Sequence, residues 1–430
     1  MRMRTVLIFA YYFPPMGLGG VQRVLKFVKY LPAYGWRPIV VTVKDVRYYD
    51  RDESLLDDIP PDATICRTGS CDPLRVGFLL RPREALHVPQ SKPPGSPGRA
   101  LARWCLFPDH QVGWVPFAVA RAWRLIRSER VDAVLSTFPP ASGHLAGLFL
   151  KRMTGLPWVA DFRDGWTDGE FSQPPSPFHR MLTRTLERLV VRRADRAIAV
   201  SPEIAAGLAA VRGDVAGVCV LTNGYDPDDF LTPTPHQNGR LTMTYCGTIN
   251  QARNPEPLFC ALRQVLDEEP DLASRVHVQL VGAAIGLDVP AMIRQYRLDG
   301  VVTPFGYLPH RDALAYIVDA DLLLLLVSSD DSRARGVPTG KIYECLAAGR
   351  PILGLVPDGA AQELLLRSGR GTVVHPHDTA GIVRAIQEWV RRATVDRRPP
   401  SSPDETLSAF TRQHLTERLA RILDDVITTR

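Results

Sequence analysis

The sequence of 430 residues lacks the signatures of several common classes of protein. No apolar run approaches 18 residues, so no membrane-spanning helix is predicted. The seven cysteines form no Cys-x-x-Cys pair and no His/Cys cluster has zinc spacing, which argues against a redox motif and a zinc site. Neither Gly-x4-Gly-Lys-[Ser/Thr] nor Gly-x-Ser-x-Gly occurs, which excludes a P-loop and a hydrolase nucleophile elbow.

The cysteines and the amino terminus both indicate a reduced, cytosolic chain. Several cysteines, such as Cys246 and Cys260, lie in apolar runs and are expected to be buried thiols. The apolar run at residues 5–10 is too short for a signal peptide and is followed by Tyr-Tyr-Phe-Pro-Pro. We therefore expect a first β-strand there.

Charge is divided unevenly along the chain. The net charge is only +6, yet residues 1–225 hold 30 Lys and Arg against 20 Asp and Glu, whereas residues 226–430 hold 22 against 26. A basic first half suggests an anionic partner such as a phosphorylated substrate, a membrane surface or nucleic acid. Nucleic acid is the least favoured of these, because the basic residues lack interleaved aromatics or a known binding motif.

Short apolar runs alternate with amphipathic stretches, which predicts an α/β fold with parallel sheets covered by helices. The pattern occurs twice, so we expect a Rossmann-like domain over 1–225, a linker over 226–240, a second such domain over 241–400 and a last helix within 401–430 that returns to the first domain. A cleft is expected between the domains, and residues 65–110 are expected to be an irregular excursion. The predicted strands are 5–10, 38–43, 132–136, 157–161, 196–200, 218–222, 242–246, 276–281, 301–305, 321–327, 351–355 and 372–374.

Ligands of open parallel sheets bind at the carboxyl ends of the strands, so the loops there carry the candidate residues. Gly19 and Gly20 precede a helix whose free N–H groups suit a phosphate, although a tight turn explains them equally well. His144 opens another helix and could contact a polar substrate or be structural. Asp161 and Arg163 directly follow an apolar strand, so they either pair with each other or face a polar ligand.

In the second half, Gly247 follows a strand and Arg253 lies just beyond it, a pattern that suits a diphosphate. Lys341 and Glu344 are three residues apart near the start of a predicted helix, where a carboxylate can accept hydrogen bonds from two ribose hydroxyls. A surface Lys–Glu pair is the alternative. No metal site is expected, because the Asp-x-Asp pair that ends at Asp321 opens a strand and sits at the wrong edge of the sheet.

These segments resemble the family 4 glycosyltransferases, which are retaining enzymes of the GT-B fold. The resemblance covers nearly the whole chain and looks closest to the subset that acts in O-antigen, capsule and exopolysaccharide assembly. It is carried by YYFPPMGLGGVQRVLKFVKYLPAYGW, STFPPASGHLAGLFLKRMTGLPWVADFRDGW, VSPEIAAGL, LTNGYDPDDF, TYCGTINQARNP, FGYLPHRD and PTGKIYECLAAGRPIL.

The resemblance implies a role for each candidate. A UDP- or GDP-sugar would be the donor, and a lipid-linked or polysaccharide glycan would be the acceptor. The residues implied in acceptor and sugar contact are His144, Asp161 and Arg163, and those implied in donor binding are Gly19, Gly20, Gly247, Arg253, Tyr307, Leu308, Lys341 and Glu344.

The implied reaction is hexosyl transfer with retention, in which N–H groups, arginine and lysine stabilise the leaving diphosphate without a metal or other cofactor. Two positions depart from the family pattern. Gly336 stands where many members have the first Glu of Glu-x7-Glu, and Gly165 stands where many have Pro. These departures leave the sugar choice open, and the first motivates a non-catalytic nucleotide-sugar binder as an alternative.

Further alternatives are a transferase for a soluble natural product and a sugar-nucleotide 2-epimerase, which shares the fold. Location also has two interpretations. Arg180, Arg184, Arg188 and Arg192 recur every fourth residue, which favours peripheral contact with the anionic inner face of the cell membrane. A solvated helix, with these arginines paired to Glu187 and Asp195, is the other interpretation.

Overall fold

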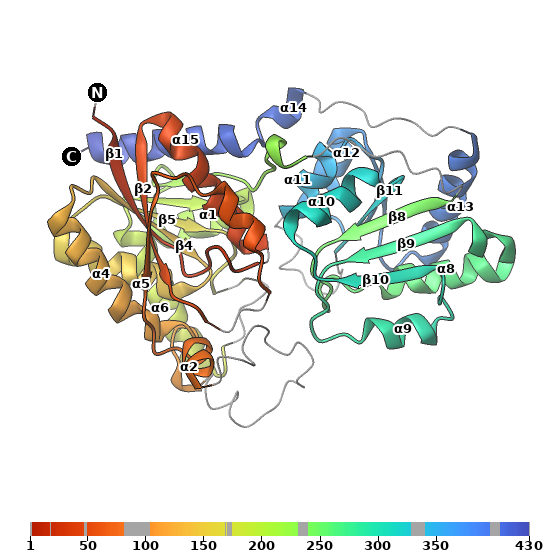
Figure 1. Ribbon diagram of the computed structural model, residues 1–430, viewed down its shortest axis with the longest axis horizontal. Coiled ribbons are helices and arrows are strands. Elements are labelled where there is room, and N and C mark those ends of the chain that lie inside the picture. Colours follow the sequence, from red (N-terminus) through yellow and green to blue (C-terminus); the bar gives the residue numbers. More distant parts are fainter. Residues whose placement is uncertain are drawn as a thin grey trace. The chain divides into compact units, whose positions relative to one another are not determined.

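The chain forms two compact units in a computed structural model, which describes residues 2–17, 19–46, 50–80, 104–167, 169, 174–230, 240–327, 340–395 and 405–429 (Figure 1). The first unit contains the described residues up to Asn223 together with those from Arg412 onward, and the second contains Gly224–Thr411. Each unit is a parallel sheet with helices packed on it, which is the Rossmann-like α/β arrangement that the sequence predicts. The cleft expected between them remains a prediction.

The first unit is built on a seven-stranded sheet in the order β3-β2-β1-β4-β5-β6-β7. Its central strands are apolar on both faces, as expected for a parallel sheet covered on both sides. The strands are β1 (Arg4–Phe9), β2 (Trp36–Val43), β3 (Thr64–Thr68), β4 (Ala133–Phe138), β5 (Trp158–Phe162), β6 (Arg196–Ala199) and β7 (Val218–Val220). The helices are α1 (Gly19–Tyr30), α2 (Pro73–Leu80), α4 (Val115–Ser128), α5 (Ala141–Thr154), α6 (Pro177–Arg193), α7 (Pro202–Arg212) and α15 (Arg412–Thr428).

The second unit is built on a six-stranded sheet in the order β10-β9-β8-β11-β12-β13. Strand β11 shows why such a sequence must lie inside: Leu322, Leu324 and Leu326 pack in the core on one face, while Leu323 and Leu325 pack on the other. The strands are β8 (Leu241–Cys246), β9 (Val276–Val281), β10 (Val302–Gly306), β11 (Leu322–Leu326), β12 (Ile352–Leu355) and β13 (Gly371–Val374). The helices are α8 (Glu256–Glu268), α9 (Val289–Gln295), α10 (His310–Asp319), α11 (Gly340–Ala347), α12 (Ala360–Ser368), α13 (Thr379–Val395) and α14 (Glu405–Ser408).

Three expectations need correction. Residues 65–110 are not wholly irregular, because β3 pairs with β2 at the sheet edge and α2 follows it. The last helix expected within 401–430 is interrupted after Ser408, and only its second part, α15, packs beside α1 in the first unit (Figure 1). Cys260 is exposed rather than buried, since it lies on the outer face of α8, whereas Cys246 is buried as expected. Among the described helices, none has the length and apolar character needed to cross a membrane.

Candidate substrate sites at the carboxyl ends of the two sheets

Each sheet has one point at which the direction of the strand order reverses. In the first unit this point lies between β1 and β4, and in the second it lies between β8 and β11. Loops that leave two such strands diverge to opposite faces, so a ligand crevice forms at their carboxyl ends. The loops after these four strands are therefore the places to look for binding groups.

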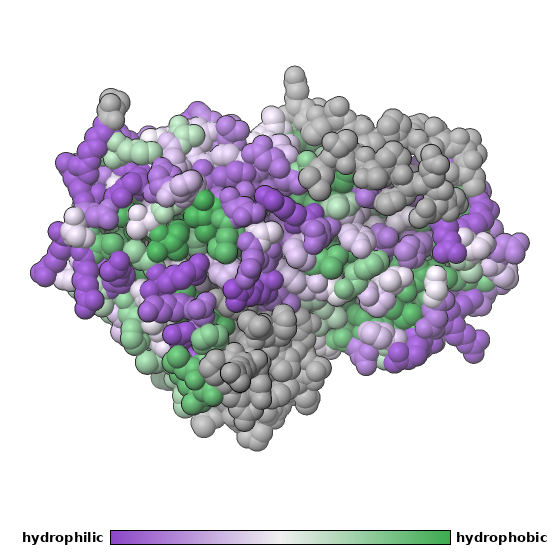
Figure 2. Space-filling model, in the orientation of Figure 1, coloured by the Kyte–Doolittle hydropathy of each residue, from purple (hydrophilic) through white to green (hydrophobic). Residues whose placement is uncertain are grey.

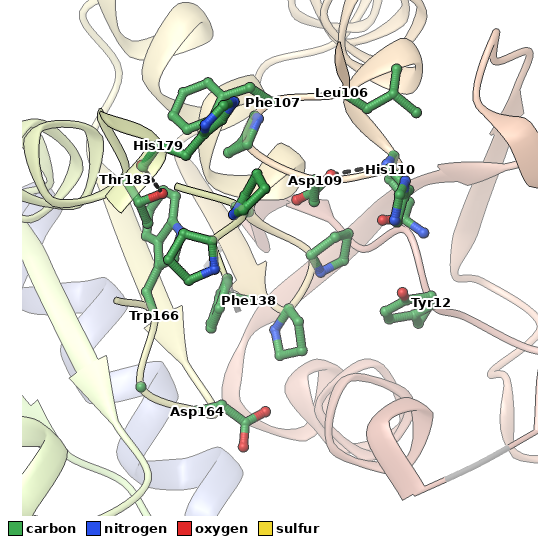
Figure 3. Close-up of a pocket in the computed structure, with 18 residues that line it drawn as sticks. Tyr12, Leu106, Phe107, Asp109, His110, Phe138, Asp164, Trp166, His179 and Thr183 are labelled. Atoms are coloured by element: carbon green, nitrogen blue, oxygen red, sulfur yellow. Dashed lines mark hydrogen bonds between the residues drawn. The ribbon is translucent and has the colours of Figure 1, made fainter. Parts of the chain in front are cut away.

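A pocket of about 410 Å³ lies at the reversal point of the first unit (Figure 3). Tyr12 enters it from the loop after β1, Phe138–Ala141 from the end of β4 and the loop after it, and Asp164–Trp166 from the loop after β5. His179 and Thr183 of α6 complete one side. Its volume falls within the range of about 300–1,000 Å³ typical of small-molecule sites.

Aromatic side chains dominate one wall of this pocket. Figure 3 shows Phe138 and Trp166 on one side and Tyr12 across from them. The rings of Phe138 and Trp166 stack with centroids 5.4 Å apart, and Trp166 is only 5% exposed. Behind them, Phe162 and His144 pack with ring centroids 4.5 Å apart. The wall is thus backed by a second layer of rings.

His144 belongs to that second layer and does not line the pocket. It is fully buried, and its Nδ1 lies 2.8 Å from Ser136 Oγ, which accepts a hydrogen bond from Trp158 Nε1 at 2.8 Å. If Ser136 donates its hydroxyl hydrogen to Nδ1, the imidazole proton lies on Nε2, which is buried and has no recorded hydrogen-bond partner. Burial lowers the pKa of His144 to about 3, so the ring is neutral at physiological pH.

Asp161 is also buried, inside β5 rather than beyond its end. Its carboxylate accepts hydrogen bonds from Arg23 Nη2 at 2.8 Å and Nε at 3.1 Å, and from Thr137 Oγ1 at 3.1 Å. Arg23 in turn donates to the carbonyls of Leu221 and Thr222. Both members of the ion pair are 1% exposed. The pair therefore fastens α1 to the sheet.

Arg163 connects the loops that form the pocket. Its guanidinium donates to the carbonyls of Phe138 at 3.1 Å and Pro139 at 2.5 Å, and to the carbonyl of Gly20 at the start of α1. One planar group thereby holds three backbone acceptors, which lie at the end of β4, in the loop after it and at the start of α1. Gly19 and Gly20 are exposed at the start of α1, and nothing lies within 4 Å of where a Cβ of Gly19 would stand.

Asp109 is a pocket residue that the sequence did not reveal. Helix α5 begins after Pro140, whose side chain cannot cap it. Asp109 supplies the cap from outside the helix, accepting hydrogen bonds from Ser142 N at 2.9 Å and Ser142 Oγ at 2.5 Å. Burial raises the pKa of Asp109, although the hydrogen bonds from Ser142 oppose the shift. No periodicity or motif marks this residue, because it lies in an irregular segment before α4.

In the second unit, three glycine-containing loops meet at the carboxyl edge of the sheet. Gly247 N donates to the carbonyl of Val281 at 2.8 Å, and Gly282 N donates to the carbonyl of Gly306 at 2.8 Å. Gly282 has φ +142°, and a Cβ there would stand 1.9 Å from the carbonyl oxygen of Gly247. Only glycine permits this close approach. The predicted donor residues Gly247, Tyr307 and Leu308 thus lie on adjoining loops.

The charged candidates gather beside Gly247. A Cβ on Gly247 would lie 3.8 Å from Lys341 Cγ, and Lys341 Nζ donates to Glu344 Oε2 at 2.9 Å. Burial lowers the pKa of Lys341, but the Glu344 carboxylate and its neighbours outweigh it, so the net pKa is raised and the ammonium is charged. Arg253 and Lys341 also act electrostatically on the Tyr245 hydroxyl, whose pKa burial raises.

Tyr245 is the residue that sequence reasoning missed in this unit. Its hydroxyl donates to the carbonyl of Thr248 at 2.9 Å and so fixes the turn that follows β8. A tyrosine at the end of an apolar strand was the available signal. Within the described part of the chain, no three His, Cys, Asp or Glu side chains group as a metal site. The absence of a metal requirement remains a prediction.

Comparison with known proteins agrees with this geometry. Residues 19–224 match the family described as the glycosyl transferase 4-like domain. Residues 19–224 therefore form a domain of this family. Among curated relatives, the D-inositol 3-phosphate glycosyltransferase of Streptomyces scabiei is 28% identical over 294 residues, which are 63% of this chain and 63% of that protein.

Two further matches describe the family context. A Salmonella typhimurium glycosyltransferase whose name places it in colanic acid biosynthesis is 25% identical over 31% of this chain and 34% of its own length. The crystal structure of Anabaena Alr3699/HepE with UDP and glucose aligns with a TM-score of 0.66 at 15% identity, covering 98% of this chain and all of that one. This likeness shows a shared GT-B fold. The chain spans less than two thirds of the curated relatives it matches.

Proposed function

We propose that this chain is a retaining glycosyltransferase that moves a hexosyl group from a UDP- or GDP-sugar to a hydroxyl of a lipid-linked or polysaccharide acceptor in cell-envelope glycan synthesis. Support for the donor comes from the structural neighbour that holds UDP and glucose. Support for the setting comes from the relative named for colanic acid biosynthesis.

The observation that carries the proposal is the cluster at the reversal point of the second unit. The N-terminus of α11, the Lys341 ammonium and the Glu344 carboxylate lie beside the Gly247 turn. N–H groups, a fixed cation and a glycine turn suit a diphosphate, and a carboxylate suits the two ribose hydroxyls. Arg253 acts electrostatically on the Tyr245 hydroxyl, which fixes the turn that contains Gly247.

These groups would act mainly on the leaving diphosphate. As the glycosidic bond breaks, negative charge grows on the phosphate oxygens, and preorganised cations and N–H dipoles lower the energy of that state. One of the phosphate oxygens takes the acceptor proton while the acceptor attacks from the same face, so the configuration is retained and no side-chain nucleophile or metal is needed. Gly19 and Gly20 would offer α1 N–H groups to the donor phosphates.

The first unit would hold the acceptor in the pocket described above. His144, Asp161 and Arg163 then serve as positioning residues rather than contacts to the sugar. His144 supports the aromatic wall, Asp161 fastens α1, and Arg163 holds the loops after β1 and β4. Exposed apolar side chains beside the pocket favour an acceptor with a lipid part: Trp104 is 55% and Phe178 is 60% exposed, and both rings contact His179.

Peripheral contact of a cytoplasmic protein with an anionic membrane forms part of the proposal. Arg180, Arg184, Arg188 and Arg192 are all exposed along α6. Asp195, which could have neutralised this stripe, is held by Lys151 at 2.6 Å instead. Helix α2 buries none of its residues, and Figure 2 shows its apolar side chains on the surface. Flotation with anionic and neutral vesicles tests this contact, since binding only to the anionic ones at low salt is expected.

The test of transfer is a screen of UDP- and GDP-sugars with and without envelope-glycan acceptors. Release of the nucleotide that depends on the acceptor is expected, with the anomeric configuration retained in the product. Isomerisation of the donor without any acceptor would instead identify a 2-epimerase. Nucleotide binding with neither reaction would identify a non-catalytic binder.

A further inference from the structure

The acidic side chains that line the pocket of the first unit favour neutral acceptors over phosphorylated ones. The described residues that line it include Asp109 and Asp164 but no lysine or arginine. A bound phosphate is held in proteins by cationic side chains, by free N–H groups at a helix N-terminus, or by both. The described lining of this pocket offers no lysine or arginine for that purpose.

The helix N-terminus at the pocket is already occupied. Helix α5 starts at the pocket edge with Ala141, and its first N–H groups are the natural place for an anion at this reversal point. The Asp109 carboxylate takes the N–H and hydroxyl of Ser142 there. A phosphate at the same position would lose these donors and would meet a buried carboxylate, and like charges at short range disfavour binding.

What remains in the pocket suits an uncharged ring. The stacked faces of Phe138 and Trp166 can pack against the C–H face of a sugar. Tyr12 and His110 lie at the opposite side in Figure 3 and offer polar groups to hydroxyls. An aromatic wall with a few polar groups is the usual composition of a pocket that orients a neutral ligand.

We propose that this pocket binds the acceptor as an uncharged sugar ring, and that Asp109 is the specificity residue that excludes phosphorylated acceptors by occupying the N-terminus of α5. The inference rests on the proposed function for the identity of the ligand as an acceptor. It would distinguish this chain from the relative whose name, D-inositol 3-phosphate glycosyltransferase, contains a phosphorylated compound.

The chain offers a matched pair of positions for the test. Thr183 lines the pocket and Thr185 does not, yet both lie on α6 and both donate their hydroxyl to the carbonyl four residues earlier, at 2.8 and 2.9 Å. Thr183→Arg places a cation in the pocket, and Thr185→Arg adds the same charge elsewhere on the helix. The probes are octyl glucoside and octyl glucoside 6-phosphate, with binding measured by saturation-transfer NMR without donor.

The wild-type protein is expected to bind octyl glucoside at least tenfold more tightly than its phosphate. Thr183→Arg should raise the affinity for the phosphate at least tenfold, whereas Thr185→Arg should leave it unchanged. Asp109→Asn, checked for folding by its melting temperature, should raise it as well. The inference is overturned if the wild type binds the phosphate as tightly as the neutral sugar, if neither probe binds, or if the two arginine variants behave alike.

These outcomes are separable from a failure of the proposed function. Loss of the sugar preference while UDP or GDP still binds and transfer still occurs would overturn only the pocket assignment. A clear preference for the neutral sugar in a protein that transfers nothing from any nucleotide sugar would leave the pocket assignment standing and would remove the transferase.

Discussion

The ion pair between Arg23 and Asp161 decides whether Asp161 holds the fold or acts on the substrate. Its two charges are 1% exposed, and two hydrogen bonds of 2.8 and 3.1 Å join them. In Asp161→Ala, Arg23 keeps its hydrogen bonds to the carbonyls of Leu221 and Thr222. It loses its ion pair with the Asp161 carboxylate, the only carboxylate among the described residues recorded beside it. Removing one partner of a buried pair typically costs about 3–5 kcal/mol of stability.

The assay is urea and thermal unfolding of Asp161→Ala beside the wild type. For a unit of this size, each kcal/mol lowers the melting temperature by about 2–4 °C, so a decrease of roughly 6–20 °C is expected. The double variant Arg23→Met with Asp161→Leu removes both charges and should recover most of the stability, because an apolar pair of similar volume is often neutral or better. A stable Asp161→Ala protein with no transferase activity would refute the structural role and restore Asp161 as a contact to the sugar.

Three further outcomes follow from the buried groups and the glycines. Burial lowers the pKa of His144 to about 3, so only the unfolded chain takes up a proton at this residue as the pH falls below about 6.5. Between pH 8 and pH 5 the wild type should therefore lose roughly 2 kcal/mol more stability than His144→Gln, measured by urea unfolding. Gly147→Ala places a Cβ 2.5 Å from Trp158 Nε1 and should lower the stability of the protein by about 1–3 kcal/mol. Gly207→Ala has open space around it and should stabilise the protein slightly. Equal effects of the two substitutions would contradict this packing. Gly282→Ala should displace the Gly247 loop and weaken nucleotide binding at least tenfold in a calorimetric titration. The affinity for a neutral glycoside should change little. Unchanged nucleotide affinity would refute the loop contact.

The periodicity of the sequence predicted most of the two sheets, and its one clear error is β3. Three of the five residues in Thr64–Thr68 are half-exposed, and Thr and Arg interrupt the apolar pattern. An edge strand of this kind has a neighbour on one side only, so its sequence need not be continuously apolar. The buried strand β11, with five consecutive leucines, could hardly be missed.

The grouping of Gly247, Lys341 and Glu344 was predictable because these residues carry local signals. Gly247 follows a strand directly, and Lys341 and Glu344 share one face of a helix. Whether a polar residue at the end of a strand faces solvent or the interior is not a local property. Asp161 pairs in register with Thr137 inside the sheet, and its cation lies 138 residues earlier in the chain.

Calorimetric titration of UDP and GDP tests the central claim, that the cluster beside Gly247 holds a nucleotide sugar, most directly. The wild type should bind one of the two nucleotides, and Glu344→Gln should bind it roughly tenfold or more weakly, because a hydrogen bond to a charged group contributes about 1.5–3 kcal/mol. Glu363→Gln, the same change in the first turn of α12, is the control and should bind as the wild type does. Failure of both nucleotides to bind the wild type, or equal affinity in Glu344→Gln and Glu363→Gln, would contradict the account.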